Sequence, residues 1–211
     1  MVANQLGARG IGDERVLEAM GTVPRELFVG PADRDRAYAD RALGIDCGQT
    51  ISQPWIIAAI CQALELRGDE RVLEIGTGSG YSTAVLSRLA ARIVSIERIA
   101  ELAEAAREKL AEAGTEGVEV RVGDGSLGSP DDGPFDAIAV HAAIPAPPRA
   151  LLSQLTLGGR LVAPVAVDGE EVLTRFRRSR GEQVEEAEYT REPLAACRFV
   201  PLIGDEGYPE R

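Results

Sequence analysis

From residue 71 onward, short apolar segments alternate with longer amphipathic ones. The predicted strands cover residues 71–75, 92–97, 118–123, 135–140 and 159–165. Helical patterns of apolar residues fill the intervals at 81–90, 99–114 and 147–155. Because parallel strands need a crossover connection, usually a helix, this order predicts an open, doubly wound, mostly parallel α/β sheet with helices on both faces.

The two ends of the chain carry different patterns. The N-terminal part reads as short helices and loops, with an amphipathic helix over 13–23 capped by Asp13 and a second helix over 54–66 that begins with Pro54. The tail alternates apolar and polar residues without intervening helices at 170–179, 182–190 and 196–203. We expect these segments to be antiparallel strands added at one edge of the sheet.

The length of 211 residues suits one domain with a sizeable core. We expect a single domain in three parts: an N-terminal helical cap (1–66), a central core (67–167) and C-terminal strands (168–211). The net charge of −11 argues against a nucleic-acid partner, because phosphate binding needs a basic surface. No apolar run reaches the ~18 residues of a membrane span, and the first residues lack an apolar signal core, so we expect no membrane partner and a cytoplasmic location.

The residues that most often bind metals are scarce. The chain has three cysteines, Cys47, Cys61 and Cys197, at unrelated spacings, and one histidine, His141. Widely separated cysteines form neither a disulfide framework nor a zinc motif, and they suit a reducing compartment. A single histidine excludes a histidine-rich centre, so we expect no metal site.

A glycine-rich segment, LEIGTGSGYS, spans the end of the first predicted strand of the sheet and the start of its helix. In open α/β sheets, ligands bind at the carboxyl ends of the strands, where this segment lies. Gly76, Gly78 and Gly80 allow sharp turns and bring backbone N–H groups close to a ligand. Tyr81 stands where a dinucleotide-binding fingerprint needs a small residue, and no Lys-Ser or Lys-Thr pair of a phosphate-binding loop follows.

Acidic residues lie near the ends of three successive predicted strands. Glu74 lies two residues before the first glycine, Glu97 ends the second strand, and Asp124 follows the third within GDGS. A carboxylate at the second position can accept hydrogen bonds from two ribose hydroxyls. A single such acid is commonly a helix cap. Together, the loop and the acids resemble the S-adenosylmethionine-binding half of class I methyltransferases.

This resemblance implies that S-adenosylmethionine is the cofactor and that 67–167 is the cofactor-binding core. It places the glycine loop at the methionine portion, with Glu74 near the amino-acid end. It also places Glu97 at the ribose and Asp124 at the adenine.

Several longer segments match one family in order along nearly the whole chain. They are RGIGDERVLEAMGTVPRELFV, RAYADRALGIDCGQTISQPWI, VLEIGTGSGY, VGDGSLG, FDAIAVHAAIPAPPRALLSQLTLGGRLVAPV and RFVPLIGDEGY. They resemble the protein-L-isoaspartate (D-aspartate) O-methyltransferases. GQTISQP is the most specific part, because unrelated methyltransferases share the glycine loop.

The family resemblance implies roles for individual residues, with Ser52 of GQTISQP as the catalytic residue. The implied cofactor contacts are Thr50, Ile51, Ser52, Glu74, Gly76, Thr77, Gly78, Gly80, Glu97, Arg98, Asp124 and Gly125. The implied substrate contacts are Ile51, Ser52, Gln53, His141 and Ala142.

The implied substrates are damaged proteins and peptides that contain L-isoaspartyl, and by extension D-aspartyl, residues. The enzyme methylates the free α-carboxylate, and the ester then loses methanol to the neighbouring amide, which closes a succinimide that partly reopens to normal Asp. A carboxylate, with a pKa near ~4, is already nucleophilic at neutral pH, so no general base is needed. We therefore expect Ser52 to hold the carboxylate rather than to transfer a proton. The alternative role of Ser52 is to cap the helix that starts two residues later.

Two positions depart from the family pattern: His141 replaces Thr or Gly, and Ile144 replaces a small Ala. These departures bear on the substrate and keep one alternative open, a related carboxyl methyltransferase that acts on an aspartate of a specific peptide or protein. A separate alternative is a non-catalytic module that binds adenosyl ligands. Retention of Ser52, Glu97, Asp124 and the three loop glycines argues against it. We expect a monomer.

Overall fold

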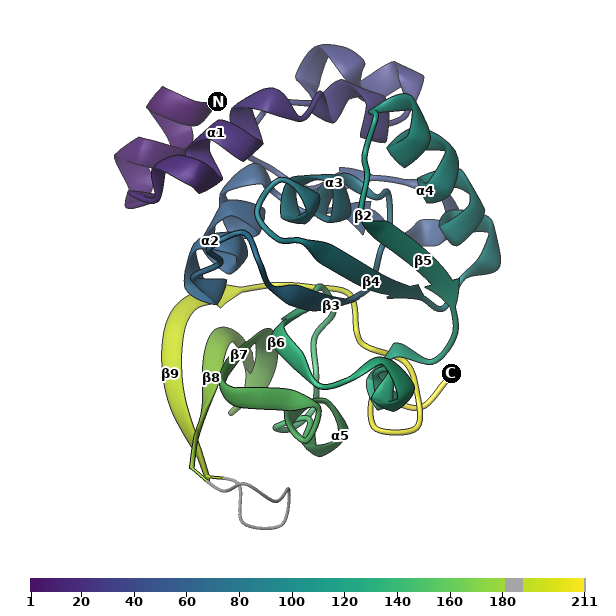
Figure 1. Cartoon of the computed structure of the whole chain (residues 1–211). Coiled ribbons are helices and arrows are strands. Elements are labelled where there is room, and N and C mark those ends of the chain that lie inside the picture. Colours follow the sequence, from purple (N-terminus) through teal and green to yellow (C-terminus); the bar gives the residue numbers. More distant parts are fainter. Residues whose placement is uncertain (181–187, 211) are drawn as a thin grey trace.

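The computed structural model describes residues 1–180 and 188–210, and its centre is a seven-stranded sheet in the order β5–β4–β3–β6–β7–β8–β9 (Figure 1). The strands are β3 (Arg71–Ile75), β4 (Arg92–Glu97), β5 (Val118–Val122), β6 (Phe135–Val140), β7 (Leu155–Val167), β8 (Glu170–Arg180) and β9 (Glu188–Cys197). The first five run parallel, whereas β8 and β9 are added antiparallel beyond β7. The strand order reverses between β3 and β6, which is where open sheets of this kind bind ligands.

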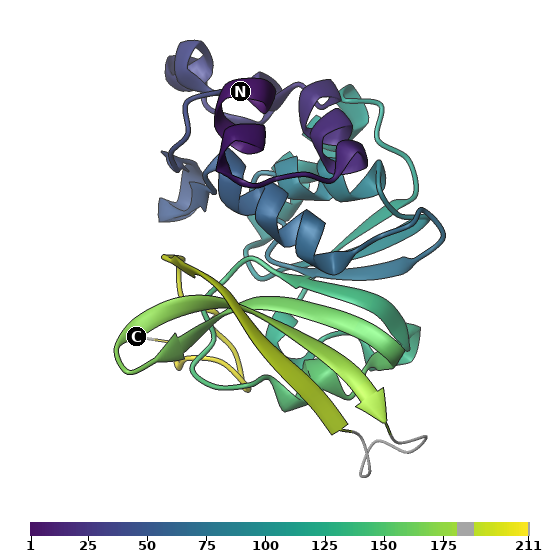
Figure 2. The same cartoon turned by 90° about the vertical axis from the view of Figure 1, so that its left-hand side faces the viewer.

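Alternate strand residues contribute to two cores on opposite faces of the sheet. Val72 belongs to one buried cluster and Leu73 to the other, as expected for side chains that alternate along a strand. The first cluster includes side chains of α1 (Glu14–Thr22), α2 (Pro54–Leu64), α3 (Tyr81–Ser87) and α4 (Ala100–Glu112). The second includes the short α5 (Arg149–Leu152) and Leu202 of the tail. Helices therefore cover both faces, but unequally, and Figure 2 shows the N-terminal helices gathered on one side.

The N-terminal part consists mainly of short helices. Helices of one or two turns occupy Val2–Leu6, Gly7–Arg9, Arg25–Phe28, Pro31–Arg36 and Asp46–Gly48, and two more follow β5 at Gly125–Leu127 and Pro130–Asp132. Asp13 caps α1 as predicted, because its carboxylate accepts hydrogen bonds from the N–H groups of Arg15 (2.9 Å) and Val16 (3.3 Å). The GQTISQP segment begins in a small antiparallel hairpin of β1 (Leu43–Gly44) and β2 (Thr50–Ile51), which the sequence did not predict.

Most predicted elements are confirmed, and the larger differences at their ends have local causes. α3 ends at Ser87, three residues early, and α5 is held to one turn because Pro148 precedes it and the chain enters β7 at Leu155. β7 starts earlier than predicted because Leu155 already pairs with Phe135, before a register shift in β6.

The tail has two long strands, β8 and β9, where three shorter ones were predicted. Most of the predicted segment 182–190 lies outside the described residues. The prediction of an antiparallel strand at 196–203 is wrong, because β9 ends at Cys197 and residues 200–202 run alongside Ala143 in a parallel sense. There, Ala143 N–H donates to Val200 O (2.8 Å) and Leu202 N–H donates to Ala143 O (2.8 Å). None of the helices in the described ranges is both long and apolar enough to cross a membrane.

Candidate active site

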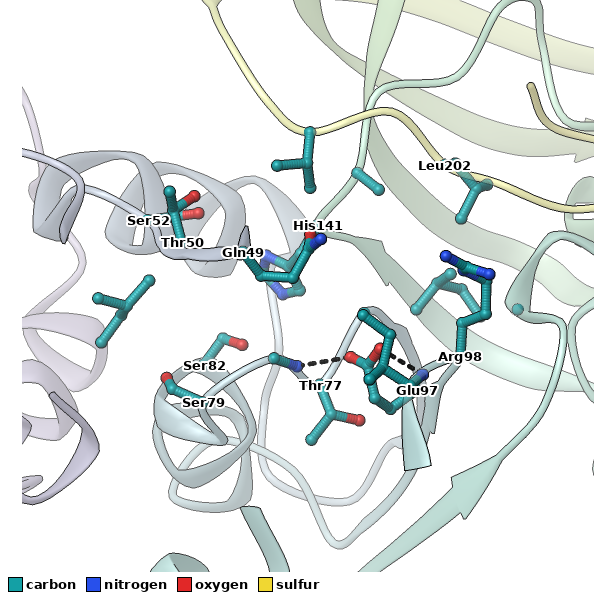
Figure 3. A pocket seen from close by; sticks show the side chains of 18 of the residues that line it. Gln49, Thr50, Ser52, Thr77, Ser79, Ser82, Glu97, Arg98, His141 and Leu202 are labelled. Carbon is teal, nitrogen blue, oxygen red and sulfur yellow. Dashed lines mark hydrogen bonds between the residues drawn. The ribbon is translucent and has the colours of Figure 1, made fainter. Parts of the chain in front are cut away.

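A cavity opens at the carboxyl ends of β3, β4 and β6 (Figure 3). Its empty volume is about 860 Å³, including the part open to solvent. It is lined by the β2 segment, the glycine loop, the start of α4, the end of β6 and the tail. The lining residues that the sequence predicted are Thr50, Ile51, Ser52, Gly76, Thr77, Gly78, Glu97, Arg98, Gly125, His141 and Ala142.

Glu97 fixes the glycine loop from the end of β4. Its Oε2 accepts a hydrogen bond from Gly78 N–H (2.8 Å) and its Oε1 accepts one from Ile99 N–H (3.0 Å), which Figure 3 marks with dashed lines. Gly78 has a φ of 54°, in the left-handed region that favours glycine. Glu97 is only 7% exposed, so the loop and the start of α4 hold its carboxylate in one position on the cavity wall.

Glu74 lies beneath the loop rather than on the cavity wall. It is fully buried and accepts hydrogen bonds from the hydroxyls of Ser82 (2.6 Å), Thr83 (2.5 Å) and Ser95 (2.6 Å). His141 Nε2 lies 3.2 Å from Glu74 Oε1. Burial by itself raises the pKa of a carboxyl, but the contacts with His141, Ser82 and Ser95 outweigh it and hold the pKa of Glu74 below its ordinary value. Direct contact of Glu74 with a cofactor stays a prediction.

Asp124 and Gly80 also lie off the cavity wall. The Asp124 carboxylate accepts hydrogen bonds from Ser126 N–H (2.8 Å) and from Asp205 N–H of the tail (2.8 Å). Burial raises the pKa of Asp124, but these bonds outweigh it and the pKa lies below the ordinary value. Asp124 therefore fixes the turn that presents Gly125 to the cavity, and the tail closes over that turn.

The alternative role of Ser52 as a helix cap is wrong. α2 begins at Pro54, its N-cap residue is Gln53, and no side chain forms a capping hydrogen bond. The Ser52 hydroxyl forms no hydrogen bond with another described residue, and the side chain lines the cavity (Figure 3). The hydroxyl is therefore available to a bound molecule.

Arg25 is a buried residue that sequence reasoning missed. It has no exposed surface, and its guanidinium lies 4.6 Å from the centre of the Tyr81 ring. Its Nε donates to Ala37 O (2.7 Å) and its Nη2 donates to Ser52 O (2.7 Å). Burial lowers the pKa of Arg25 from its usual range. Arginines are mostly exposed, so no sequence pattern indicates that Arg25 is buried. In the structure it holds the backbone of Ser52 against α3.

Other lining residues were also missed. The tail contributes Val200, Pro201, Leu202 and Ile203, and the remaining additions are Gln49, Ile57, Ile75, Ser79, Tyr81, Ser82, Ile96 and Ile99. The only sequence signal for these tail residues was the family-like segment RFVPLIGDEGY.

A second cavity, with an empty volume of about 720 Å³, adjoins the first. Its own lining residues are Arg9, Ala42, Gln53, Trp55, Ile56, Ala196, Cys197, Arg198 and Phe199. Four residues line both cavities: Thr50, Ser52, His141 and Val200. The two cavities therefore meet beside Ser52 and His141.

The fold and the first cavity define a class of protein. A glycine loop follows the central parallel strand, an acid ends the next strand, and an acidic turn follows the third. Among the described residues, no three His, Cys, Asp or Glu side chains are grouped so that they could hold a metal ion. The chain is a class I methyltransferase, the class that takes its methyl group from S-adenosylmethionine.

Comparisons with known proteins identify the family. The model of the family "Protein-L-isoaspartate(D-aspartate) O-methyltransferase (PCMT)" matches residues 1–207. The chain is 52% identical over 209 residues to protein-L-isoaspartate O-methyltransferase 2 of Pelobacter propionicus, covering 99% of this chain and 91% of that protein. It is 53% identical over 209 residues to the protein-L-isoaspartate O-methyltransferase of Methanoculleus marisnigri, covering 99% and 92%.

Two solved structures agree with this result. A protein-L-isoaspartate O-methyltransferase has a TM-score of 0.82 at 28% identity, over 96% of this chain and 65% of that chain. A Plasmodium falciparum structure in complex with S-adenosyl-L-homocysteine has a TM-score of 0.79 at 22% identity, over 96% of both chains, and shares the fold. The chain belongs to the protein-L-isoaspartate (D-aspartate) O-methyltransferase family, whose members methylate isoaspartyl residues as a step in protein repair.

The position of Arg25 predicts a large effect on stability. Arg25→Met keeps an apolar stem but removes the donors to Ala37 O and Ser52 O, so the free energy of unfolding should fall by about 2 to 4 kcal/mol. Thermal or urea denaturation measures it. The control is Arg34→Met, an exposed arginine of the same N-terminal part, which should unfold like the parent. Equal stability of the Arg25 and Arg34 variants would contradict the role given to Arg25.

Proposed function

We propose that the first cavity holds S-adenosylmethionine, that the second holds an isoaspartyl segment of a damaged protein, and that Ser52 holds the reacting carboxylate where the cavities meet. The observation that supports this most is the shared wall: Ser52 and His141 line both cavities. A methyl donor in the first cavity and a methyl acceptor in the second would have their reacting groups close together. Such proximity supplies much of the rate increase in a transfer reaction.

The first cavity suits the cofactor. When bound, S-adenosylmethionine supplies an electrophilic methyl group on a positively charged sulfur. Glu97 has further lone pairs for ribose hydroxyls, and Gly76, Thr77 and Gly78 bring the backbone of the loop to the wall. Arg98 and Gly125 complete the proposed contacts, with Thr50 and Ile51 facing them from β2. Glu74, Gly80 and Asp124 fix the turns around the site, and their direct contact with the cofactor stays a prediction.

The methyl acceptor needs to be positioned rather than activated. An isoaspartyl α-carboxylate is ionised at neutral pH and attacks without a general base. The Ser52 hydroxyl donates to one carboxylate oxygen, which leaves the other oxygen free to attack the methyl carbon. Ile51, Gln53 and Ala142 contribute the neighbouring walls and exclude water.

His141 is the second proposed contact with the substrate carboxylate. Both of its ring nitrogens are buried without a hydrogen-bond partner among the described residues, although Nε2 lies within ion-pair distance of Glu74. A hydrogen on a ring nitrogen would let His141 donate to the substrate carboxylate.

The finer properties belong to the same proposal. We infer activity toward D-aspartyl residues as well, a monomeric state, a cytoplasmic location and a single folding unit made of 1–66, 67–167 and 168–211. The tail supports the single unit, because Asp205 N–H bonds to Asp124 of the core.

Methyl transfer to a matched pair of peptides tests the function. The chain should methylate an isoaspartyl peptide with S-adenosylmethionine and leave its aspartyl twin unmodified. Ser52→Ala should lower kcat/KM by about 10- to 100-fold, the value of one hydrogen bond to a charged group, while Ser87→Ala at the end of α3 should not. Equal transfer to both peptides would instead support methylation of ordinary aspartate, and binding of the cofactor without transfer would support a non-catalytic module.

The place of His141 on the wall of both cavities predicts an effect on substrate binding. His141→Thr should raise KM for an isoaspartyl peptide with kcat little changed, because the substitution removes the proposed contact with the substrate carboxylate. Steady-state kinetics with an isoaspartyl peptide measures both constants. An unchanged KM in His141→Thr would show that His141 does not contact the substrate.

A further inference from the structure

The second cavity differs in charge from the rest of the protein. The chain has 34 Asp and Glu against 23 Lys and Arg. None of the described residues that line this cavity is acidic, whereas two of them, Arg9 and Arg198, are arginines. A concave surface lined by one sign of charge attracts ligands of the opposite sign.

The two arginines are held differently. Arg9 forms an ion pair with Asp40, and its guanidinium lies 4.5 Å from the centre of the Trp55 ring, so its charge is largely engaged. Arg198 is exposed and forms no ion pair or side-chain hydrogen bond with another described residue. The free positive charge on this wall is therefore that of Arg198.

The backbone around Arg198 is fixed. Phe199 N–H donates to Glu171 Oε2 (2.6 Å), and Cys197 Sγ lies 3.6 Å from Glu171 O. These contacts anchor the residues on both sides of Arg198 to β8. The backbone of Arg198 is therefore held at a defined position on the cavity wall. Glu171, the acid that makes these contacts, does not line the cavity.

We propose that the second cavity selects isoaspartyl segments that carry another carboxylate close to the isoaspartyl residue, and that Arg198 binds that carboxylate. This inference rests on the proposed function, in which Ser52 and His141 hold the carboxylate that is methylated. A second carboxylate then meets Arg198, whose planar guanidinium can form two parallel hydrogen bonds with it. The carboxylate can come from an acidic side chain or from the end of a peptide chain.

The expected preference is modest because Arg198 is exposed. One solvent-accessible ion pair changes binding by about two- to fivefold, and salt weakens it. The preference should therefore be visible in kcat/KM at low ionic strength and should shrink at high salt. A neighbouring lysine in the peptide should have the opposite effect.

The test uses isoaspartyl peptides that differ only beside the isoaspartyl residue. One pair carries Glu or Gln next to it, and a second pair ends at the following residue with a free or an amidated carboxyl group. The parent protein should prefer the carboxylate member of at least one pair by about two- to fivefold at low salt, and the pair that responds identifies the source of the carboxylate. Arg198→Gln should lose this preference. The matched control is Arg191→Gln, an exposed arginine of β9 that lines neither cavity and should keep it.

Two results would overturn the inference. The first is equal kcat/KM within both pairs for the parent protein at low salt. The second is a preference that Arg198→Gln retains in full. A failure of the proposed function gives a different result, because then none of the isoaspartyl peptides, neutral ones included, would be methylated.

Discussion

The buried carboxylate of Glu74 links the parts of the protein that form the site. From β3 it accepts hydrogen bonds from Ser82 and Thr83 of α3 and from Ser95 of β4, and it lies beside His141 at the end of β6. An unpartnered charge at such a position would cost several kcal/mol, so these contacts are obligatory once Glu74 is buried. The contacts of Glu74 fix the glycine loop between β3 and α3. The contact with His141 fixes the position of that side chain as well.

Two further polar contacts complete the frame around this centre. Glu97 holds the outer side of the glycine loop through Gly78 N–H, and Arg25 holds the backbone of Ser52 against Tyr81. Residues far apart in the chain thus form one wall, because Ser52 from the N-terminal part and His141 from the sheet both line the two cavities. Methyl transfer needs mainly such positioning, because the attacking carboxylate is already ionised and the cofactor carries its own leaving group.

The sequence predicted the parts of the fold that depend on local patterns. Apolar periodicity placed β3, β4 and β6, and the glycine spacing with Glu97 indicated the ligand site. The tail was predicted less well, because the pairing of residues 200–202 with Ala143 depends on where β9 ends rather than on alternation. Arg25 could not be predicted, since its burial follows from packing between distant segments. The resemblance placed Glu74 near the cofactor, and only the structure shows that its carboxylate accepts hydrogen bonds from the hydroxyls of Ser82, Thr83 and Ser95.

The central claim is that donor and acceptor lie in two cavities that meet at Ser52. A crystal structure with S-adenosylhomocysteine and an isoaspartyl peptide tests it most directly. The account predicts the adenosyl group in the cavity beside Glu97, the peptide beside Trp55 and Arg198, and a peptide α-carboxylate oxygen within hydrogen-bond distance of Ser52 Oγ. A peptide bound outside the second cavity, or a carboxylate directed away from Ser52, would contradict it.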